Sequence, residues 1–156
     1  MKIMRGLLIA VGLIAFIVFC AWGYTTLVIT SASRNGAYPT AEQAMLGMLG
    51  KVYSADRQIK IIYAGTNSFD GSDPHIWYVI AEVRASARAD GSSLNRNGCD
   101  APGMFFLQTK QGWVFVPEGM FPTLAGRFMK VFGMAGEGAP TPSTNWAPDQ
   151  NPRYCL

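Results

Sequence analysis

The stretch Gly6–Ile29, GLLIAVGLIAFIVFCAWGYTTLVI, decides how this chain is organised, because it runs for 24 residues without a charge. A helix rises about 1.5 Å per residue, so this stretch would span roughly 36 Å and cross a hydrocarbon core of about 30 Å with some tilt. We therefore expect residues 6–29 to form a transmembrane signal-anchor helix. The rest of the chain is interpreted by its position relative to this helix.

The charges beside the stretch predict its orientation. Lys2 and Arg5 precede it, and only Arg34 lies close to its far end. By the positive-inside rule, residues 1–5 stay in the cytoplasm and the C-terminal part is exported. Trp22 and Tyr24 stand where an aromatic belt would mark the outer membrane interface. The sequence thus predicts a single-pass protein of the cell membrane with an extracytoplasmic domain.

A cleaved secretory signal is another interpretation of the stretch that stays open, whereas a lipoprotein anchor is disfavoured. A cleaved secretory signal has an apolar region of about 7–15 residues followed by a small-residue site. Thr30-Ser31-Ala32 could serve as that site, although the apolar run is longer than usual. A lipoprotein would need a small residue before the modified cysteine, whereas Cys20 follows Phe19.

A short basic leader that ends in Gly6 and runs into a long apolar helix resembles the start of a type IV pilin or pseudopilin. The resemblance implies that the leader is clipped after Gly6, and that the chain is a minor pilin-like subunit. In that family the fifth mature residue is usually glutamate, whereas this chain has Val11. Asn35-Gly36 and Pro39 also interrupt the long helix that a pilin would continue.

Length and charge limit the function classes. The 156 residues leave room for one small domain beyond the anchor. There are 13 Lys and Arg against 10 Asp and Glu, and Lys2 and Arg5 supply most of the excess, so the exported part is nearly neutral. No basic stripe with interleaved aromatic residues is present, which argues against nucleic-acid binding. The expected partners are the lipid bilayer and a protein partner or larger membrane complex.

The three cysteines allow one disulfide outside the anchor. Cys20 lies in the anchor, and Cys99 and Cys155 lie in the exported part. A Cys99–Cys155 bridge would close a loop of more than 50 residues and stabilise the fold by roughly 4 kcal/mol on the chain-entropy model. Two unpaired thiols are the alternative, because spacing alone does not establish pairing.

The domain is predicted to begin after a linker, residues 30–39, and to cover residues 40–136. Thr40 and Gln43 fit a capping box, in which the Thr40 hydroxyl accepts from the amide of residue 43. The following apolar residues recur at helical spacing and predict a helix with one apolar face: Ala41, Ala44, Met45, Met48, Leu49 and Val52.

Four strands are expected next. Alternation over 59–64 predicts the first, with Ile59, Ile61 and Tyr63 on one face. The clearest is 76–88, in which Trp77, Val79, Ala81 and Val83 alternate with polar and aromatic residues. Residues 104–110 and 113–116 predict two more, joined by a hairpin at Gln111-Gly112.

Pro122 opens a second predicted helix, in which Leu124, Phe128, Val131 and Phe132 share one face. Residues 137–156 contain four prolines and no period, so a Pro-rich tail is expected. The fold class is α+β: a transmembrane helix, then a helix, a four-stranded antiparallel sheet and a helix, with both helices on one sheet face.

From Thr40 to Gly136, this order and the Gly112-Trp113 hairpin resemble the cystatin-like and NTF2-like group of small α+β domains. Several members of that group are membrane-anchored extracytoplasmic modules. The resemblance implies a fold, because fold similarity does not carry function with it.

No catalytic residue is predicted. His75 is the only histidine, so a metal site built from several histidines has no second one to use, and a surface turn residue is the favoured interpretation of His75 over a general base. Asp70-Gly71-Ser72-Asp73 lacks the later bidentate glutamate of a calcium loop and is interpreted as a turn. Cys99 has no basic neighbour that would lower its pKa. We expect no cofactor and no metal, and an enzyme is the less favoured interpretation.

A ligand pocket is nevertheless conceivable on one sheet face. NTF2-like enzymes hold an acid or base among aromatic residues there, and the matching residues here are Tyr78, Ile80, Glu82, Arg84 and Trp113. The alternative to a pocket is a solvent-exposed ion pair between Glu82 and Arg84.

The sequence thus predicts a membrane-anchored binding or assembly module, such as an accessory subunit of a larger complex. An NTF2-like ligand-binding domain or enzyme and a minor pilin-like subunit are the alternatives.

Overall fold

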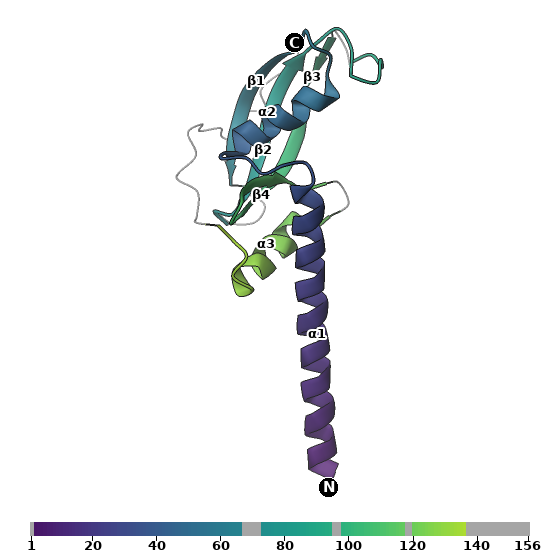
Figure 1. The fold of residues 1–156 in the computed structure, drawn as a ribbon, viewed down its shortest axis with the longest axis vertical. Coiled ribbons are helices and arrows are strands. Elements are labelled where there is room, and N and C mark those ends of the chain that lie inside the picture. Colours follow the sequence, from purple (N-terminus) through teal and green to yellow (C-terminus); the bar gives the residue numbers. More distant parts are fainter. Residues whose placement is uncertain (1, 67–72, 95–97, 118–119, 137–156) are drawn as a thin grey trace, which may run out of the picture.

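In the computed structural model, the chain is a long helix that carries a small α+β domain at its C-terminal end (Figure 1). The structure describes residues 2–66, 73–94, 98–117 and 120–136. The predicted Pro-rich tail, residues 137–156, lies outside them. An N-terminal apolar helix followed by an antiparallel sheet and helices confirms the α+β class.

Helix α1 (Lys2–Ser33) is continuous over 32 residues. It runs four residues past the expected end of the anchor, so the first part of the predicted linker is helical. The reason is tertiary packing: Thr25, Val28 and Ala32 recur at helical spacing and are fully buried against the domain. The helix ends at the predicted Asn-Gly turn, where Gly36 has a φ of 99°.

Helix α2 (Ala41–Val52) begins where the capping residues predicted. The Gln43 amide donates to the Thr40 hydroxyl oxygen over 3.2 Å, which satisfies one of the free amides of the first turn. Four apolar residues of the predicted face are buried: Ala41, Ala44, Met45 and Leu49.

The sheet has the strand order β1-β2-β4-β5, and every pairing is antiparallel. Its strands are β1 (Gln58–Thr66), β2 (Ile76–Arg84), β4 (Gly103–Thr109) and β5 (Gly112–Phe115). A two-residue strand, β3 (Cys99–Asp100), pairs with β2 on the same edge as β4. Strand β3 was not predicted, because it lies in a stretch of turn-forming residues.

Strand β1 carries a bulge that changes which residues face α2. The register shifts between Ile61, opposite Ala81, and Tyr63, opposite Ile80. Ile59 and Ile61 therefore pack on the α2 side, but after the bulge Ala64 takes the place predicted for Tyr63.

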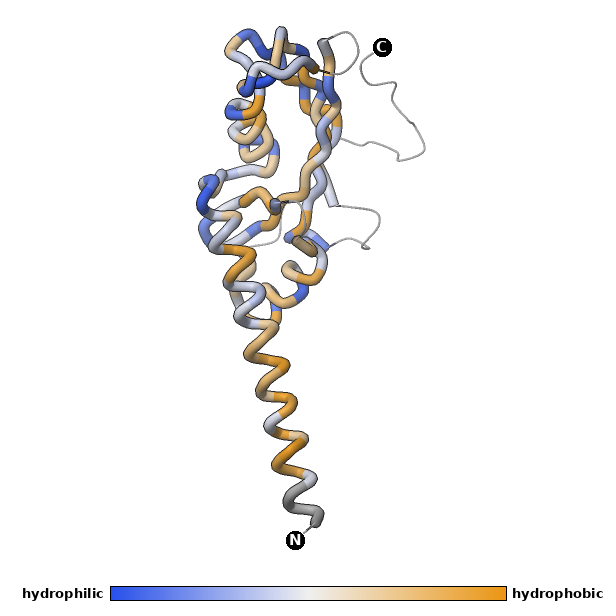
Figure 2. The backbone as a smooth tube through the Cα atoms, turned by 90° about the vertical axis from the view of Figure 1, so that its right-hand side faces the viewer, coloured by the Kyte–Doolittle hydropathy of each residue, from blue (hydrophilic) through white to orange (hydrophobic). Residues whose placement is uncertain are grey.

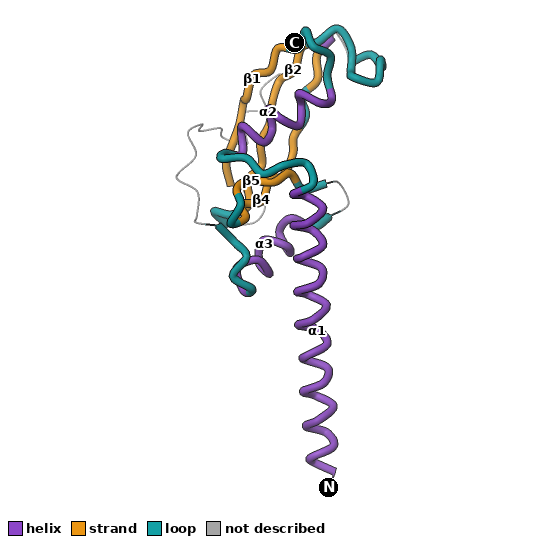
Figure 3. Tube along the Cα trace, viewed as in Figure 1, coloured by secondary structure: helices purple, strands orange, loops and turns teal. Residues whose placement is uncertain are grey.

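The helices cover opposite faces of the sheet, so the prediction that both lie on one face is wrong. Helix α2 packs with Trp77, Val79 and their neighbours in a cluster that we call the α2-side core. Helix α3 (Pro122–Val131) and the end of α1 pack with Ile76 and Leu107 in a second cluster, the α1/α3-side core. Successive residues of a strand point to opposite faces, so Ile76 and Trp77 enter different cores. Figure 3 shows α2 lying across the strands and α3 near the junction of α1 with the domain.

Candidate functional site

The free part of α1 is the most unusual surface of the protein. Every large apolar side chain from Leu7 to Phe19 is more than half exposed, and Figure 2 shows this apolar helix leaving the domain. By length and composition, residues 6–33 form the one helix among the described residues that could span a membrane. A candidate membrane-anchoring element is therefore present.

The two predicted interface residues lie where the helix meets the domain. Trp22 is exposed, with its ring centroid 6.3 Å from that of Phe19. Tyr24 packs against the α1/α3-side core, and its hydroxyl oxygen accepts a hydrogen bond from the Phe121 amide over 3.1 Å. The expected membrane boundary and the start of the folded domain thus coincide along α1.

Part of the predicted pocket lies together on the sheet surface. Arg84 Nε donates to Glu82 Oε1 over 2.8 Å, and their side chains are 58% and 23% exposed. An ion pair this exposed is worth at most about 1 kcal/mol. The pair lines a shallow hollow of 310 Å³ with residues of β1.

Trp113 is not brought to that surface. It is buried in the α2-side core, with its ring centroid 5.1 Å from that of Trp77. Tyr78, Glu82 and Arg84 alternate with Trp77 along β2 and so belong to the opposite face. Ile80 is buried. The five residues therefore do not form one pocket.

A larger hollow of 580 Å³ lies on the face opposite α2. The rings of Tyr78 and Phe105 stand 4.8 Å apart in its wall. Its other walls are mostly apolar and include Pro102, Phe115, Pro117, Met120 and Pro122. Burial raises the pKa of Tyr78, so its hydroxyl stays protonated. This hollow could hold a small apolar group, and of the predicted pocket residues only Tyr78 lines it.

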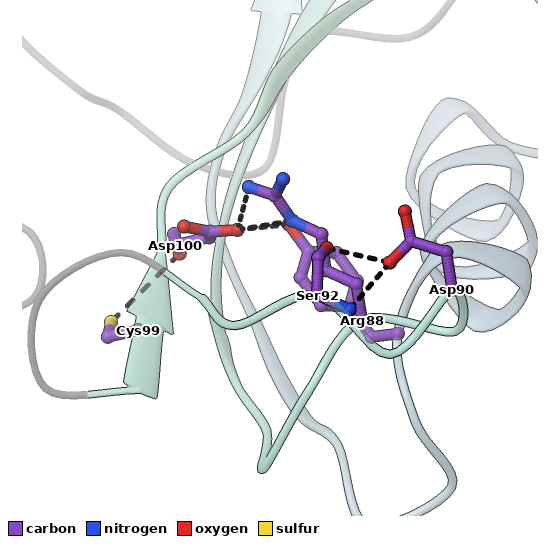
Figure 4. Close-up of polar contacts among 6 residues, drawn as sticks. Arg88, Asp90, Ser92, Cys99 and Asp100 are labelled. Atoms are coloured by element: carbon purple, nitrogen blue, oxygen red, sulfur yellow. Dashed lines mark hydrogen bonds and ion pairs between the residues drawn. The ribbon is translucent and has the colours of Figure 1, made fainter.

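Three elements are tied together by a buried carboxylate, shown in Figure 4. Asp100 Oδ2 accepts from the Tyr53 hydroxyl over 3.0 Å and from Arg88 Nη2 over 2.8 Å. Burial, supported by the bond to Asp100, raises the pKa of Tyr53 to about 12. Tyr53 therefore remains a proton donor near neutral pH, and the network joins the end of α2 to the loop after β2 and to β3. No sequence pattern had indicated it.

The loop that follows Arg88 is closed by Asp90. Its Oδ1 accepts from the Ser92 amide over 2.9 Å and from the Ser92 hydroxyl over 2.6 Å, as Figure 4 shows. These hydrogen bonds lower the pKa of Asp90. Such a turn positions the loop and is not by itself a binding site.

Cys99 is disulfide-bonded, and Cys20 is a free cysteine. The predicted partner, Cys155, lies outside the described residues, so the pairing stays a prediction. Cys99 Sγ lies 4.0 Å from the Asp100 carbonyl oxygen. Because a disulfide sulfur has no proton to donate, we describe this approach as a contact.

The remaining candidates for chemistry, His75 and Asp73, meet through the backbone amide of His75. The His75 amide donates to Asp73 Oδ1 over 3.0 Å, and Lys130 Nζ lies 3.0 Å from the same oxygen. The described residues contain no group of three metal-ligating side chains. Asp70, in the turn that we compared with a calcium loop, lies outside those residues.

Helix α2, the four longer strands and α3 follow one another in the order predicted from the sequence. Element order shows a fold class and carries no activity. The function must therefore be inferred from the geometry of this chain itself. No family model matches the chain, and neither a curated protein nor a solved structure matches it.

Proposed function

We propose that this chain is a single-pass membrane protein that presents its small domain at the extracytoplasmic surface for binding or assembly, as an accessory subunit of a larger complex. One observation carries the proposal: α1 divides into two parts. Its first half is apolar and exposed on all sides, whereas Thr25, Val28 and Ala32 are built into the domain. The anchor and the domain are thus joined by packing as well as by the chain.

The exposed apolar surface of α1 supports a membrane environment on energetic grounds. Between Leu7 and Phe19 there are ten exposed large apolar side chains. Burying each one fully is worth about 1.5–3 kcal/mol, so water is a poor environment for this segment by on the order of 15 kcal/mol or more. A lipid bilayer removes that cost without any further protein contact.

The proposed orientation rests on Lys2 and Arg5, which precede the apolar segment and would stay in the cytoplasm. A binding role is favoured over chemistry by the Tyr53–Asp100–Arg88 network. Its donors and its acceptor oxygen satisfy one another, and a satisfied buried network of this kind acts as structural support.

Site-specific labelling of whole cells tests the anchor and its orientation. In a Cys20→Ser background, in which Cys99 stays disulfide-bonded, one further cysteine is added at a time, by Lys2→Cys or by Lys60→Cys, an exposed position on β1. A membrane-impermeant maleimide should label Lys60→Cys in intact cells and Lys2→Cys only after lysis. The reverse pattern would contradict the orientation, and release of the protein by alkaline carbonate would contradict the anchor.

The assembly role needs a separate experiment. After chemical cross-linking in cells and gentle detergent extraction, the full chain should migrate well above its monomer mass and carry a defined second protein. A chain that remains monomeric under these conditions would show that the domain is not an accessory subunit.

A second candidate function, binding of a small apolar ligand, is favoured by the 580 Å³ hollow beside Tyr78 and Phe105. Met120→Trp should fill this hollow and weaken binding of a fluorescent fatty acid. Leu46→Trp, at an exposed position of α2 on the opposite face, is the matched control. Equal binding by the two variants would exclude the hollow as the site.

A further inference from the structure

Helix α3 has an exposed apolar stripe in addition to its buried face. Ala125, Gly126 and Met129 are buried against the domain. Phe121, which precedes the helix, and Leu124 and Val131 are 66%, 42% and 76% exposed. The half-buried Phe128 completes spacings of three, four and three residues along the stripe, which place these four side chains on one side of a helix.

The predicted apolar face of this helix is therefore not its core-facing side. Leu124, Phe128, Val131 and Phe132 do lie close together around the helix, but Leu124 and Val131 point away from the domain. Two of the three core-facing residues, Ala125 and Gly126, are small, and α3 approaches the sheet closely beside them. A side chain at Gly126 would collide with Ile76 of β2.

The stripe lies at the level where α1 leaves the domain. The hydrogen bond from the Phe121 amide to the Tyr24 hydroxyl joins the start of α3 to the residue that we expect at the outer membrane interface. Ala125 and Met129 share the α1/α3-side core with Val28 of α1. Figure 1 shows α3 on the side of the domain from which the free part of α1 projects. The stripe thus begins, at Phe121, beside the end of the proposed membrane-spanning segment.

The charges of α3 suit a phospholipid surface. Arg127 and Lys130 are its charged residues, both are exposed, and the helix contains no acidic residue. Lys130 also pairs with Asp73. A short helix with apolar residues on one side and cations beside them matches an interfacial amphipathic helix.

We propose that α3 lies in the outer headgroup layer of the bilayer that α1 crosses. Phe121, Leu124 and Val131 insert among the upper acyl chains, and Arg127 and Lys130 meet lipid phosphates. This inference rests on the proposed anchor. It implies that the domain is held against the membrane by two elements, a spanning helix and an interfacial helix, with one fixed side facing the lipid.

The test uses the full chain with Cys20→Ser, reconstituted into vesicles of equal parts phosphatidylcholine and phosphatidylglycerol. Nitroxide labels are attached to Leu124→Cys and, separately, to Val131→Cys. The accessibility of each label to oxygen, which concentrates in lipid, is compared with its accessibility to a water-soluble nickel complex. Lys60→Cys reports on water and Phe16→Cys on the span; both positions are exposed in the protein.

Labels at Leu124 and Val131 should show a ratio of oxygen to nickel accessibility above that of Lys60 and towards that of Phe16. A ratio equal to that of Lys60 would overturn the proposal. Shielding from both reagents would also overturn it, because a second copy of the chain would then cover the stripe. If the Phe16 label lies in lipid while the α3 labels lie in water, the interfacial helix is wrong but the anchor stands. If the Phe16 label itself lies in water, the anchor is wrong as well.

Discussion

Asp100 is the residue on which three separate segments depend, because one of its oxygens accepts from both Tyr53 and Arg88 while its backbone pairs with β2. A buried carboxylate is stable only when such donors surround it. Removing a single donor should therefore destabilise the loop after β2.

Tyr53→Phe removes one donor and should lower the free energy of unfolding by about 1–2 kcal/mol. It should also remove the tyrosine that ionises at a pKa of about 12. That pKa is raised above the ordinary value of 10.0, so the stability linked to it is complete below pH 10 and is lost as the pH rises through 12. Tyrosinate absorbance against pH measures this. Burial also raises the pKa of Tyr63 and Tyr78, so the variant should show one fewer tyrosine that ionises above the ordinary range, and an unchanged number would contradict the assignment.

The predicted Cys99–Cys155 bridge is tested by mass spectrometry. In a Cys20→Ser background, the exported protein should take up no alkylating reagent without reductant and two equivalents after reduction. Cys155→Ser should expose the Cys99 thiol and lower the free energy of unfolding by roughly 4 kcal/mol on the chain-entropy model. Alkylation of Cys99 without reductant in the parent protein would contradict the pairing.

Local chemistry could be predicted from the sequence at the residue scale, whereas contacts across the fold could not. Thr40 caps α2 as its neighbours indicated, because a cap depends on residues three positions apart. Trp113 was assigned to the wrong sheet face. Whether residues of two strands share a sheet face depends on how the strands are paired. The alternation of apolar residues within each strand does not specify this pairing.

At the scale of single elements, the two glycines of α2 make a matched pair. A side chain at Gly47 would collide with the ring of Tyr38, whereas one at Gly50 would meet only the end of the flexible Arg57 side chain. Alanine gains about 1 kcal/mol of helix propensity over glycine. Gly50→Ala should therefore raise the unfolding temperature and Gly47→Ala should lower it. Thermal unfolding followed by circular dichroism measures both, and equal shifts would contradict the close approach of Tyr38.

Most helices and strands could be predicted, because the spacing of apolar residues that identifies each of them lies within a short stretch of sequence. The differences arise where tertiary contacts intervene. Helix α1 continues to Ser33 since the domain buries its last turns, and the bulge in β1 reverses the facing of Tyr63. The stripe on α3 is a further example: hydropathy identifies Leu124 and Val131 as apolar but does not distinguish core-facing residues from exposed ones.

At the scale of the whole molecule, the domain contains two cores on opposite faces of one sheet, and α1 contributes to only one of them. The α2-side core is made entirely of residues beyond α1. The α1/α3-side core includes Val28 and Ala32. The last turns of α1 therefore belong to the domain, and the boundary between the exposed apolar part of α1 and the domain falls inside the helix.

This boundary makes a prediction about fragments in water. A fragment that begins at Ala21 should fold as a soluble domain, because it keeps the buried residues of α1. A fragment that begins at Arg34 should be less stable and should expose the apolar surface that Val28 and Ala32 cover, detectable as increased binding of a hydrophobic dye.

In the fragment that begins at Ala21, two neighbouring residues of α1 test whether its packing against the domain stabilises the fold. Val28 is fully buried and Leu27 is 60% exposed. Val28→Ala should lower the free energy of unfolding by about 2 kcal/mol through the cavity that it leaves, whereas Leu27→Ala should change it by less than about 0.5 kcal/mol. Urea unfolding of the two variants measures the difference. Equal effects would mean that α1 is attached only through the chain, and the domain would then be free to turn relative to the membrane.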